Sequence, residues 1–549
     1  MNKINNLSKI TISSCIVITL IITPWVNVDS MIIPKLIMLA LTAAYLLPSL
    51  LVIIKTNLPN MDWILKSVLI CVLLIIIQMI LVMFFTNSPF EQQFFGKTGR
   101  GLGFLTYFSL LILFTISIFI FQKKTLSYFF NGLFYSSFFS SIYSIVQFYG
   151  YDIFNWVSRT NGIIGTIGNP NFQSSFSAIA LVSSLNYFIQ KSWNRKILAT
   201  LHSLVLIYTV YLCQSWQGYG LVIVTLTALF LIYTWYKSRV IFSLSSLICF
   251  LLAIPTVLGM IKMGPFSDLL YKTSVKSRGE MWRSSFAAFK DNPVFGIGLD
   301  SFGDYSLMYK SPIDLNGVNE FTDNSHNFYL EFATTGGLLL LILNLTLIVL
   351  TFYSFIILMK RSIGFDLQKA MLFCVWICLI AQSIISPATI PLLIWSYVLS
   401  GVVIGLASEN SIEYLSNISK VKSASVNFLS LRWVFVILVC VLLYPYYNVD
   451  RLHRDSARSG DALLAIKVAQ MYPQSVLRYQ RIGRELLESN LPEQALVVAR
   501  AATQFNPNSF SGWALVLSNG LALDSERKEA LQKLKRIDPL NPELKAFKP

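Results

Sequence analysis

A scarce histidine is the first candidate for chemistry in this sequence. His326 is one of three histidines in 549 residues, and it lies in the segment TDNSHNFYLEFATTGG, just before a long apolar run that begins at Leu338. A neutral imidazole can take a proton from an attacking hydroxyl near neutral pH. His326 is therefore a candidate for proton transfer.

Arginines supply a second chemical function, because their planar fork binds phosphate in a bidentate way. The candidates are Arg100, Arg159, Arg278 and Arg283. A cavity that gathers such cations beside an imidazole would suit glycosyl transfer from a polyprenyl diphosphate, with arginine stabilising the departing diphosphate. No cluster of Asp, Glu and His indicates a metal, and no nucleotide-binding or serine-hydrolase motif is present. We therefore predict neither a metal nor a cofactor.

The chain that must position these groups has the composition of a membrane protein. Hydrophobic residues make up 55% and charged residues 13%, whereas a soluble domain carries about 25% charged residues. Apolar runs such as LICVLLIIIQMILVMFF are long enough to cross a bilayer as helices. We predict an all-α polytopic membrane protein with about 13 transmembrane helices. The predicted spans are 10–26, 36–54, 64–85, 102–121, 128–149, 172–188, 197–213, 219–235, 240–261, 337–358, 371–385, 390–406 and 433–447.

Basic residues fix the predicted orientation. The net charge is +16, which in a soluble protein would suggest nucleic acid, but here lysine and arginine collect in alternate short loops. Such loops face the cytoplasm. We predict a cytoplasmic N-terminus, an extracytoplasmic C-terminus and no nucleic-acid partner.

Two large segments then lie outside the membrane, a loop at 262–327 and a tail at 448–549. The predicted domains are thus a membrane domain at 1–447 and a soluble helical domain at 448–549. Within the tail, Pro473, Pro507 and Pro539 each follow an apolar helical pattern, about one tetratricopeptide period apart. The tail is either a short repeat array, able to contact a protein partner, or a generic helical cap.

The outer loop is predicted to begin with an amphipathic helix. Trp282, Phe286 and Phe289 recur on one side of the stretch KSRGEMWRSSFAAFK, as in helices that lie in the membrane interface. Asp291, Pro293 and the following glycines end the helix, and His326 comes later in the same loop.

The order of these motifs resembles the signature loop of the O-antigen ligase and polymerase superfamily. The resemblance rests on Arg278-x-x-x-Trp282, Asn292-Pro293 with Gly296 and Gly298, His326-Asn327-x-x-x-Glu331, and Gly336-Gly337. The earlier segments GKTGRGLGFLTY and GTIGNPNF are similar to outer motifs of the same family.

The resemblance implies a metal-independent, inverting glycosyltransferase in the bacterial cytoplasmic membrane. Such enzymes move a glycan from undecaprenyl diphosphate to an acceptor hydroxyl on the outer face. By position, Arg278 would contact the diphosphate, His326 would activate the acceptor or support the departing group, and Arg100 would shape the donor site. Asn327 and Glu331 of the same motifs are further candidates for substrate binding.

One position departs from the family pattern. Many relatives carry Ser-Arg-Gly where this chain reads Ser215-Trp216-Gln217-Gly218. Gln217 can hydrogen-bond to a substrate but cannot neutralise a diphosphate. Either Arg159 or Arg283 supplies the missing charge, or the donor differs.

Other interpretations stay open. Single arginines can snorkel to lipid headgroups, and a lone histidine is often only a hydrogen-bonding residue. A lipid-linked glycan flippase or another polysaccharide transporter is the alternative function, and a receptor built around the tail is a third. The expected partners are a polyprenyl-diphosphate-linked glycan donor, membrane lipids and an acceptor that is a glycan, a lipid or a protein. Ligase and polymerase use the same donor chemistry, so the sequence does not separate them.

Overall fold

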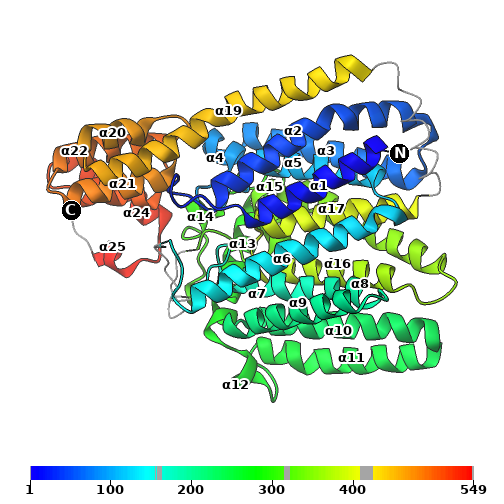
Figure 1. Ribbon diagram of the computed structural model, residues 1–549. Coiled ribbons are helices and arrows are strands. Elements are labelled where there is room, and N and C mark those ends of the chain that lie inside the picture. Colours follow the sequence, from blue (N-terminus) through cyan, green and yellow to red (C-terminus); the bar gives the residue numbers. More distant parts are fainter. Residues whose placement is uncertain (1, 155, 157–162, 315–321, 409–424, 547–549) are drawn as a thin grey trace.

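Figure 1 shows the protein as a computed structural model that describes residues 2–154, 156, 163–314, 322–408 and 425–546. In these ranges the regular structure is helical and includes no strand, which confirms the all-α class. Helices are expected here, because a backbone in lipid has to satisfy its hydrogen bonds within its own segment. The protein is a polytopic membrane protein.

The membrane part is a bundle of long helices that lie side by side. Its members are α1 (Asn2–Leu20), α2 (Ile32–Asn57), α3 (Trp63–Phe85), α5 (Phe104–Ile120), α6 (Leu126–Phe148), α7 (Pro170–Ala180), α8 (Leu185–Phe188), α9 (Trp193–Leu212), α10 (Trp216–Lys237), α11 (Arg239–Met260), α15 (Phe328–Lys360), α16 (Leu367–Ile385), α17 (Ile390–Ala407) and the first part of α19 (Ser425–Ser459). Of the described helices, nine are long and apolar enough to cross a membrane, or ten if the bent pair α5 and α6 counts as one span. Each predicted span overlaps helical structure of the bundle, but 172–188 is divided among α7, a 3-10 turn and α8, and 10–26 continues past the end of α1 at Leu20. The exact number of crossings stays a prediction.

The centre of the bundle is held by a close contact between α5 and α17. A methyl group added to Gly401 would lie 2.2 Å from the carbonyl oxygen of Phe114, and one added to Gly405 would lie 2.0 Å from that of Ile118. These two glycines form a Gly-x-x-x-Gly pattern, which lets two membrane helices approach until their backbones touch.

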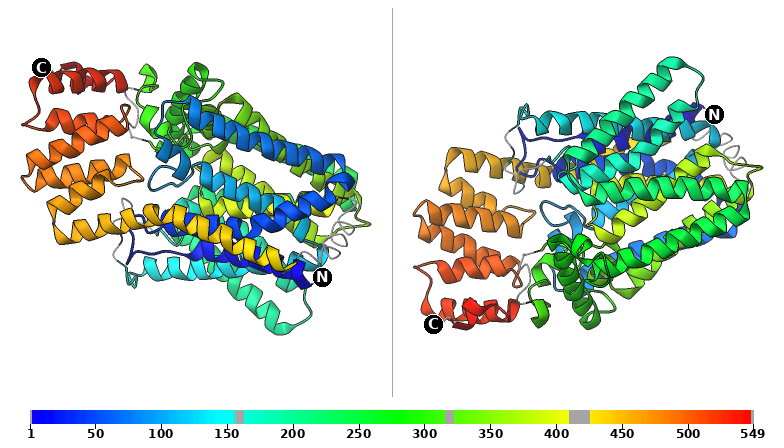
Figure 2. Two further views of the ribbon diagram at one scale, coloured as in Figure 1. Left: turned by 90° about the horizontal axis from the view of Figure 1, so that it is seen from above. Right: turned by 90° about the horizontal axis from the view of Figure 1, so that it is seen from below.

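The two ends of the bundle differ. In Figure 1 the N-terminus lies at the end opposite the C-terminal tail, and Figure 2 shows the tail as a stack of short helices beside the bundle. The loops that carry Arg100, Arg278 and His326 gather at the tail end. Short helices support these loops: α4 (Phe90–Phe95), α12 (Ser267–Leu270), α13 (Thr273–Asp291) and α14 (Phe302–Tyr305).

The amphipathic helix predicted in the outer loop is confirmed as α13, which ends at Asp291. Its buried side is formed by small residues such as Ser285 and Ala288, whereas Phe286 on the other side is half exposed. Phe286 therefore faces away from the protein core, whereas Trp282 and Phe289 are partly buried, so a position of this helix in the membrane interface stays a prediction.

Helix α15 begins earlier than the predicted span at 337, and it is broken where that span was expected to begin. Gly337 has φ +80°, and the chain on either side is helical. The segment after α13 holds this break: Leu338 N–H donates to Pro293 O at 2.8 Å, and Ile297 N–H donates to Thr334 O at 2.9 Å. Residues 328–336 thus form a short helix of their own, which positions the histidine that precedes it.

The tail contains α20 (Ala462–Gln470), α21 (Val476–Glu488), α22 (Pro492–Phe505), α23 (Phe510–Ser518), α24 (Asp524–Ile537) and α25 (Pro542–Ala546). Pro473, Pro507 and Pro539 follow the ends of α20, α22 and α24, as their spacing indicated. Helix α19 runs without interruption from the bundle into the tail, so the predicted boundary at residue 447 falls inside a helix. The assignment of these helices to tetratricopeptide repeats stays a prediction.

Candidate active site

His326 lies in a tight turn at the start of α15. Its φ is +51°, and its backbone N–H donates to Asn324 Oδ1 at 2.9 Å. The next residue, Asn327, caps the helix, because its Oδ1 accepts from the N–H groups of Tyr329 and Leu330 at 3.0 Å each. Asparagine is a preferred residue at this capping position. The predicted substrate-binding residue Asn327 therefore uses its side-chain oxygen to fix the turn that carries His326.

Arg100 and Glu331 hold the same turn from the other side. Arg100 Nη2 lies 3.3 Å from Glu331 Oε1, and its Nη1 donates to the carbonyl oxygen of Asp323. Glu331 Oε2 in turn accepts from the N–H and the hydroxyl of Ser325, at 2.7 and 2.9 Å. These two predicted site residues thus brace the segment 323–326 and leave Arg100 little freedom to reach a ligand.

Asp300 is a further partner of Arg100, and the sequence motifs did not indicate it. Arg100 Nε lies 3.1 Å from Asp300 Oδ1, and the side chain of Asp300 is fully buried. Asp300 Oδ2 accepts from the N–H groups of Lys97 and Leu102 at 2.8 and 3.1 Å. Burial raises the pKa of Asp300 to about 6, although the guanidinium of Arg100 and these N–H groups act in the opposite direction.

Arg278 differs from Arg100 in having no carboxylate partner among the residues that the structure describes. Its Nε donates to Ile385 O and its Nη1 to Ser274 O, each at 2.8 Å. Burial lowers the pKa of Arg278. A cation that is partly removed from water and has no counter-ion among the described residues is ready to bind an anionic ligand.

His326 lies within the electrostatic reach of both arginines. Burial, together with the charges of Arg278 and then Arg100, lowers the pKa of His326 from 6.5 to about 4. The ring is therefore neutral at physiological pH, and its buried Nδ1 has no hydrogen-bond partner among the described residues. The structure thus brings together His326, Arg278, Arg100 and Glu331 from segments far apart in the sequence.

Gln217 adjoins this group through the end of α16. Its Nε2 donates to Ser386 Oγ, and Ser386 follows the residue whose carbonyl accepts from Arg278. The buried Oε1 of Gln217 has no partner among the described residues. The position where the resemblance led us to expect an arginine is thus occupied by a neutral amide that lies next to the backbone carbonyl that binds Arg278.

The two arginines proposed to replace the missing charge have different outcomes. Arg283 pairs with the buried carboxylate of Asp314, with its Nη2 close to Oδ1 and its Nε 3.2 Å from Oδ2. This pairing already neutralises the charge of Arg283. Arg159 lies outside the described residues, so its part in the site stays a prediction.

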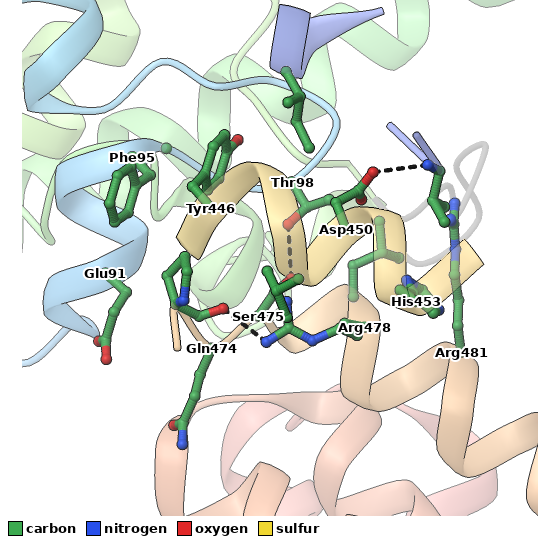
Figure 3. Close-up of a pocket in the computed structure, with 16 residues that line it drawn as sticks. Glu91, Phe95, Thr98, Tyr446, Asp450, His453, Gln474, Ser475, Arg478 and Arg481 are labelled. Atoms are coloured by element: carbon green, nitrogen blue, oxygen red, sulfur yellow. Dashed lines mark hydrogen bonds between the residues drawn. The ribbon is translucent and has the colours of Figure 1, made fainter. Parts of the chain in front are cut away.

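The tail contacts the loop that carries Arg100. Thr98 and Ser475 share a hydrogen bond of 2.7 Å, which Figure 3 shows together with neighbouring residues of α19 and α21. Asn506 donates to Asp304 Oδ2 at 2.9 Å, and Lys97 lies 3.7 Å from the same carboxylate. Lys97 also pairs with Asp323 at 2.8 Å. A continuous set of polar contacts therefore runs from the tail to the turn that holds His326.

Sequence patterns could not have indicated most of these supporting residues. Arg100 and its partner Glu331 are 231 positions apart, and the tail residue Asn506 is 202 positions from Asp304. The one local signal for Asp300 is its place in GIGLDSF, two residues after the second of two glycines that have positive φ. Asp300 itself has φ +52°.

We expect the exchange Asp300→Asn to destabilise the protein by about 3–5 kcal/mol, because it would leave the buried guanidinium of Arg100 short of its nearest counter-charge. The measurement is thermal unfolding of the purified, detergent-solubilised chain. The exposed Asp268 on α12 provides the matched control Asp268→Asn, for which little change is expected. Equal unfolding temperatures for the two variants would show that the pair with Arg100 adds no net stability.

Comparison with known proteins agrees with this geometry. A family model described as O-Antigen ligase matches residues 197–345. The match covers Gln217, Arg278, His326 and Glu331, and it ends within α15. No curated protein matches the chain.

In the described residues no group of three or more His, Cys, Asp and Glu side chains could hold a metal ion.

Most of the residues that converge at the tail end of the bundle therefore lie in the matched region. Arg100 and the tail residues that contact its loop lie outside the matched region. Residues 197–345 form an O-antigen ligase domain within a polytopic membrane protein, which supports a function in surface polysaccharide assembly.

Proposed function

We propose that this protein transfers a glycan from a polyprenyl diphosphate to an acceptor hydroxyl at the tail end of the helix bundle. The observation that supports this most directly is the proximity of a neutral His326 to the partly buried guanidinium of Arg278, which has no carboxylate partner among the described residues. One residue can take a proton, and the other can bind an anion. The tail end would be the extracytoplasmic face of the bacterial cytoplasmic membrane, as the distribution of basic residues predicts.

Arg278 would bind the diphosphate of the donor. Its Nε and Nη1 are engaged with backbone carbonyls, which fix the plane of the guanidinium and leave Nη2 for a ligand. Charge-assisted hydrogen bonds to phosphate strengthen as negative charge develops on the departing oxygen. Arg100, in contrast, is paired with Asp300 and Glu331, and we assign it to positioning the site.

A hollow in the membrane part supports a lipid-linked donor. It measures about 50 Å³ and lies between α5, α15, α16 and α17, with Phe328, Tyr329, Leu393 and Tyr397 among its lining residues. Phe328 and Tyr329 come two and three residues after His326. The first units of a polyprenyl chain could therefore enter the bundle directly below the diphosphate.

The reaction would be a single displacement. His326 takes the proton of the acceptor hydroxyl, and the acceptor oxygen forms a bond to the anomeric carbon of the donor glycan. The bond between that carbon and the diphosphate oxygen breaks, its electron pair stays with the diphosphate, and Arg278 stabilises the new charge. Attack opposite the departing group inverts the anomeric configuration. The products are the lengthened or attached glycan and polyprenyl diphosphate.

The test uses the full chain in liposomes that contain undecaprenyl-diphosphate-linked glycan from the host. We expect the assay to form a new glycosidic bond and to release undecaprenyl diphosphate, which mass spectrometry and thin-layer chromatography detect. Movement of the donor between leaflets without bond formation would contradict the proposal and favour a flippase. Product size then separates the acceptors: longer lipid-linked chains indicate a polymerase, and glycan on a different lipid or on a protein indicates a ligase.

A further inference from the structure

A polar cavity of about 260 Å³ lies where the outer loop meets the tail. The segment after α13 contributes Asn292, α14 and the residues after it contribute Tyr305 and Tyr309, and the tail contributes Asn508 and Arg536. Phe85 at the end of α3 forms part of the rim, and its exposed ring stacks on Phe295 with centroids 5.1 Å apart. None of these residues has a part in the proposed reaction.

Two asparagine–tyrosine pairs give the cavity its hydrogen-bonding surface. Asn508 Nδ2 donates to the hydroxyl of Tyr305 at 3.0 Å, and Asn292 Nδ2 donates to the hydroxyl of Tyr309 at 3.1 Å. The side-chain oxygens of both asparagines accept no hydrogen bond from the described residues. They remain available to a ligand that offers hydroxyl groups.

The charge of the cavity is also uneven. Arg536 is exposed, has no ion-pair partner among the described residues, and lines a cavity whose described lining contains no aspartate or glutamate. Such a surface does not suit a metal ion, which needs carboxylate or imidazole ligands. Amide oxygens, phenol rings and one guanidinium suit a ring-shaped polyol, with or without an acidic substituent.

We propose that this cavity binds a sugar unit of the glycan acceptor, an inference that rests on the proposed glycosyl transfer. The cavity wall includes Ile297, whose backbone N–H donates a hydrogen bond to Thr334 O near the C-terminal end of the short helix 328–336. Thr334 lies eight positions after His326, and the six helical steps from Phe328 to Thr334 cover about 9 Å along the axis. A bound acceptor of several sugar units can therefore place a terminal hydroxyl at His326 while an inner unit occupies the cavity.

This assignment gives the tail a function in choosing the acceptor. Two of the seven hydrogen-bonding side chains that line the cavity, Asn508 and Arg536, come from the tail, which lies outside the matched O-antigen ligase region. The donor site needs only the membrane part and its outer loop. Changes in the tail lining should therefore alter the acceptor while the donor site stays intact.

The experiment measures binding of a lipid-free probe, the oligosaccharide released by mild acid from the lipid-linked glycan of the host, to the full-length chain in detergent. Ligand-observed NMR gives the dissociation constant. We expect Arg536→Ala and Asn508→Ala each to raise it about tenfold, the loss typical of one good hydrogen bond to a charged or well-placed group. Arg536 is exposed and has no ion-pair partner among the residues that the structure describes, so its variant is expected to keep the fold. Lys535→Ala, at the neighbouring exposed position on α24, is the matched control and should bind the probe as the wild type does.

The same variants separate this inference from the proposed function. In the transfer assay they should raise the KM for the acceptor and leave the KM for the donor lipid unchanged. Failure of the wild type to bind the probe, or unchanged binding by both variants, would overturn the assignment of the cavity. A raised donor KM with an unchanged acceptor KM would overturn it too. Probe binding that depends on Arg536 in a protein without transfer activity would leave the cavity assigned and refute the transferase.

Discussion

Replacement of Arg278 by alanine is expected to lower glycan transfer by about 10²–10³-fold, the loss that follows removal of one preorganised group from a developing negative charge. Arg278 is a partly buried arginine of the site, and it has no carboxylate partner among the described residues. Its full charge is therefore available to the diphosphate. Arg100 lies close by but shares its charge with Asp300 and Glu331, so it cannot take over this function.

The conservative exchange Arg278→Lys distinguishes charge from geometry. Lysine keeps the positive charge but lacks the planar fork that holds Ile385 O and a phosphate at the same time. We expect its activity to lie between those of the wild type and Arg278→Ala. The measurement is the initial rate of transfer in liposomes, normalised to the amount of inserted protein.

The control for Arg278 lies on the same helix. Lys290 is exposed at the end of α13 and contacts the ring of Phe286, so Lys290→Ala should retain the wild-type rate. If Arg278→Ala also retained that rate, the diphosphate would have to bind elsewhere, and the mechanism proposed here would be wrong.

The sequence predicted the helical architecture well, because its signals for helices are local. Apolar runs define the spans, and Asp291 with Pro293 ends α13 where the helix pattern stops. The break of α15 at Gly337 is different in kind. It depends on Val294, whose carbonyl oxygen would lie 2.1 Å from a methyl group on that glycine. A contact between segments that are remote in sequence produces no periodic pattern in the amino-acid sequence, so it could not be predicted from that pattern.

The sequence predicted which residues form the candidate site, and the structure indicates which of them position the site and which are free to bind a ligand. His326, Arg278, Arg100 and Glu331 do converge. The contacts of Arg100 and Glu331 indicate that these residues position the turn at Ser325, because their charged groups contact each other and that turn. Sequence motifs record which residues a family keeps together, but they do not record which of the cations has a counter-ion.

The tail was the least predictable part of the site. Its helices could be read from their apolar pattern, but Ser475 and Asn506 have no feature that marks them as contacts of the Arg100 loop. Both are small polar residues near the start of α21 and the end of α22, where turn residues are common. Their importance appears only when the tail is placed against the bundle.

Replacement of His326 by alanine or glutamine is expected to lower the turnover rate by about 10²–10⁴-fold, the usual contribution of a positioned general base. Glutamine is the sharper variant, because it preserves much of the side-chain volume and a hydrogen-bonding group but cannot accept the proton. Both variants should insert into the membrane normally. Wild-type turnover in the glutamine variant would show that His326 does not transfer the proton.

The pH profile of the wild type then tests the direction of that transfer. A base has to be neutral, and the pKa of His326 is lowered to about 4, so kcat/KM should stay level from about pH 5.5 to 8 and fall only below that range. A histidine that instead donated a proton to the departing group would need the charged form, and activity would rise as the pH fell towards 4.

Because the charge of Arg278 contributes to the lowered pKa of His326, the residual activity of Arg278→Ala should begin to fall at a higher pH than that of the wild type. A shift in that direction would show that the two residues act on one another across the same site, whereas an unshifted profile would separate them.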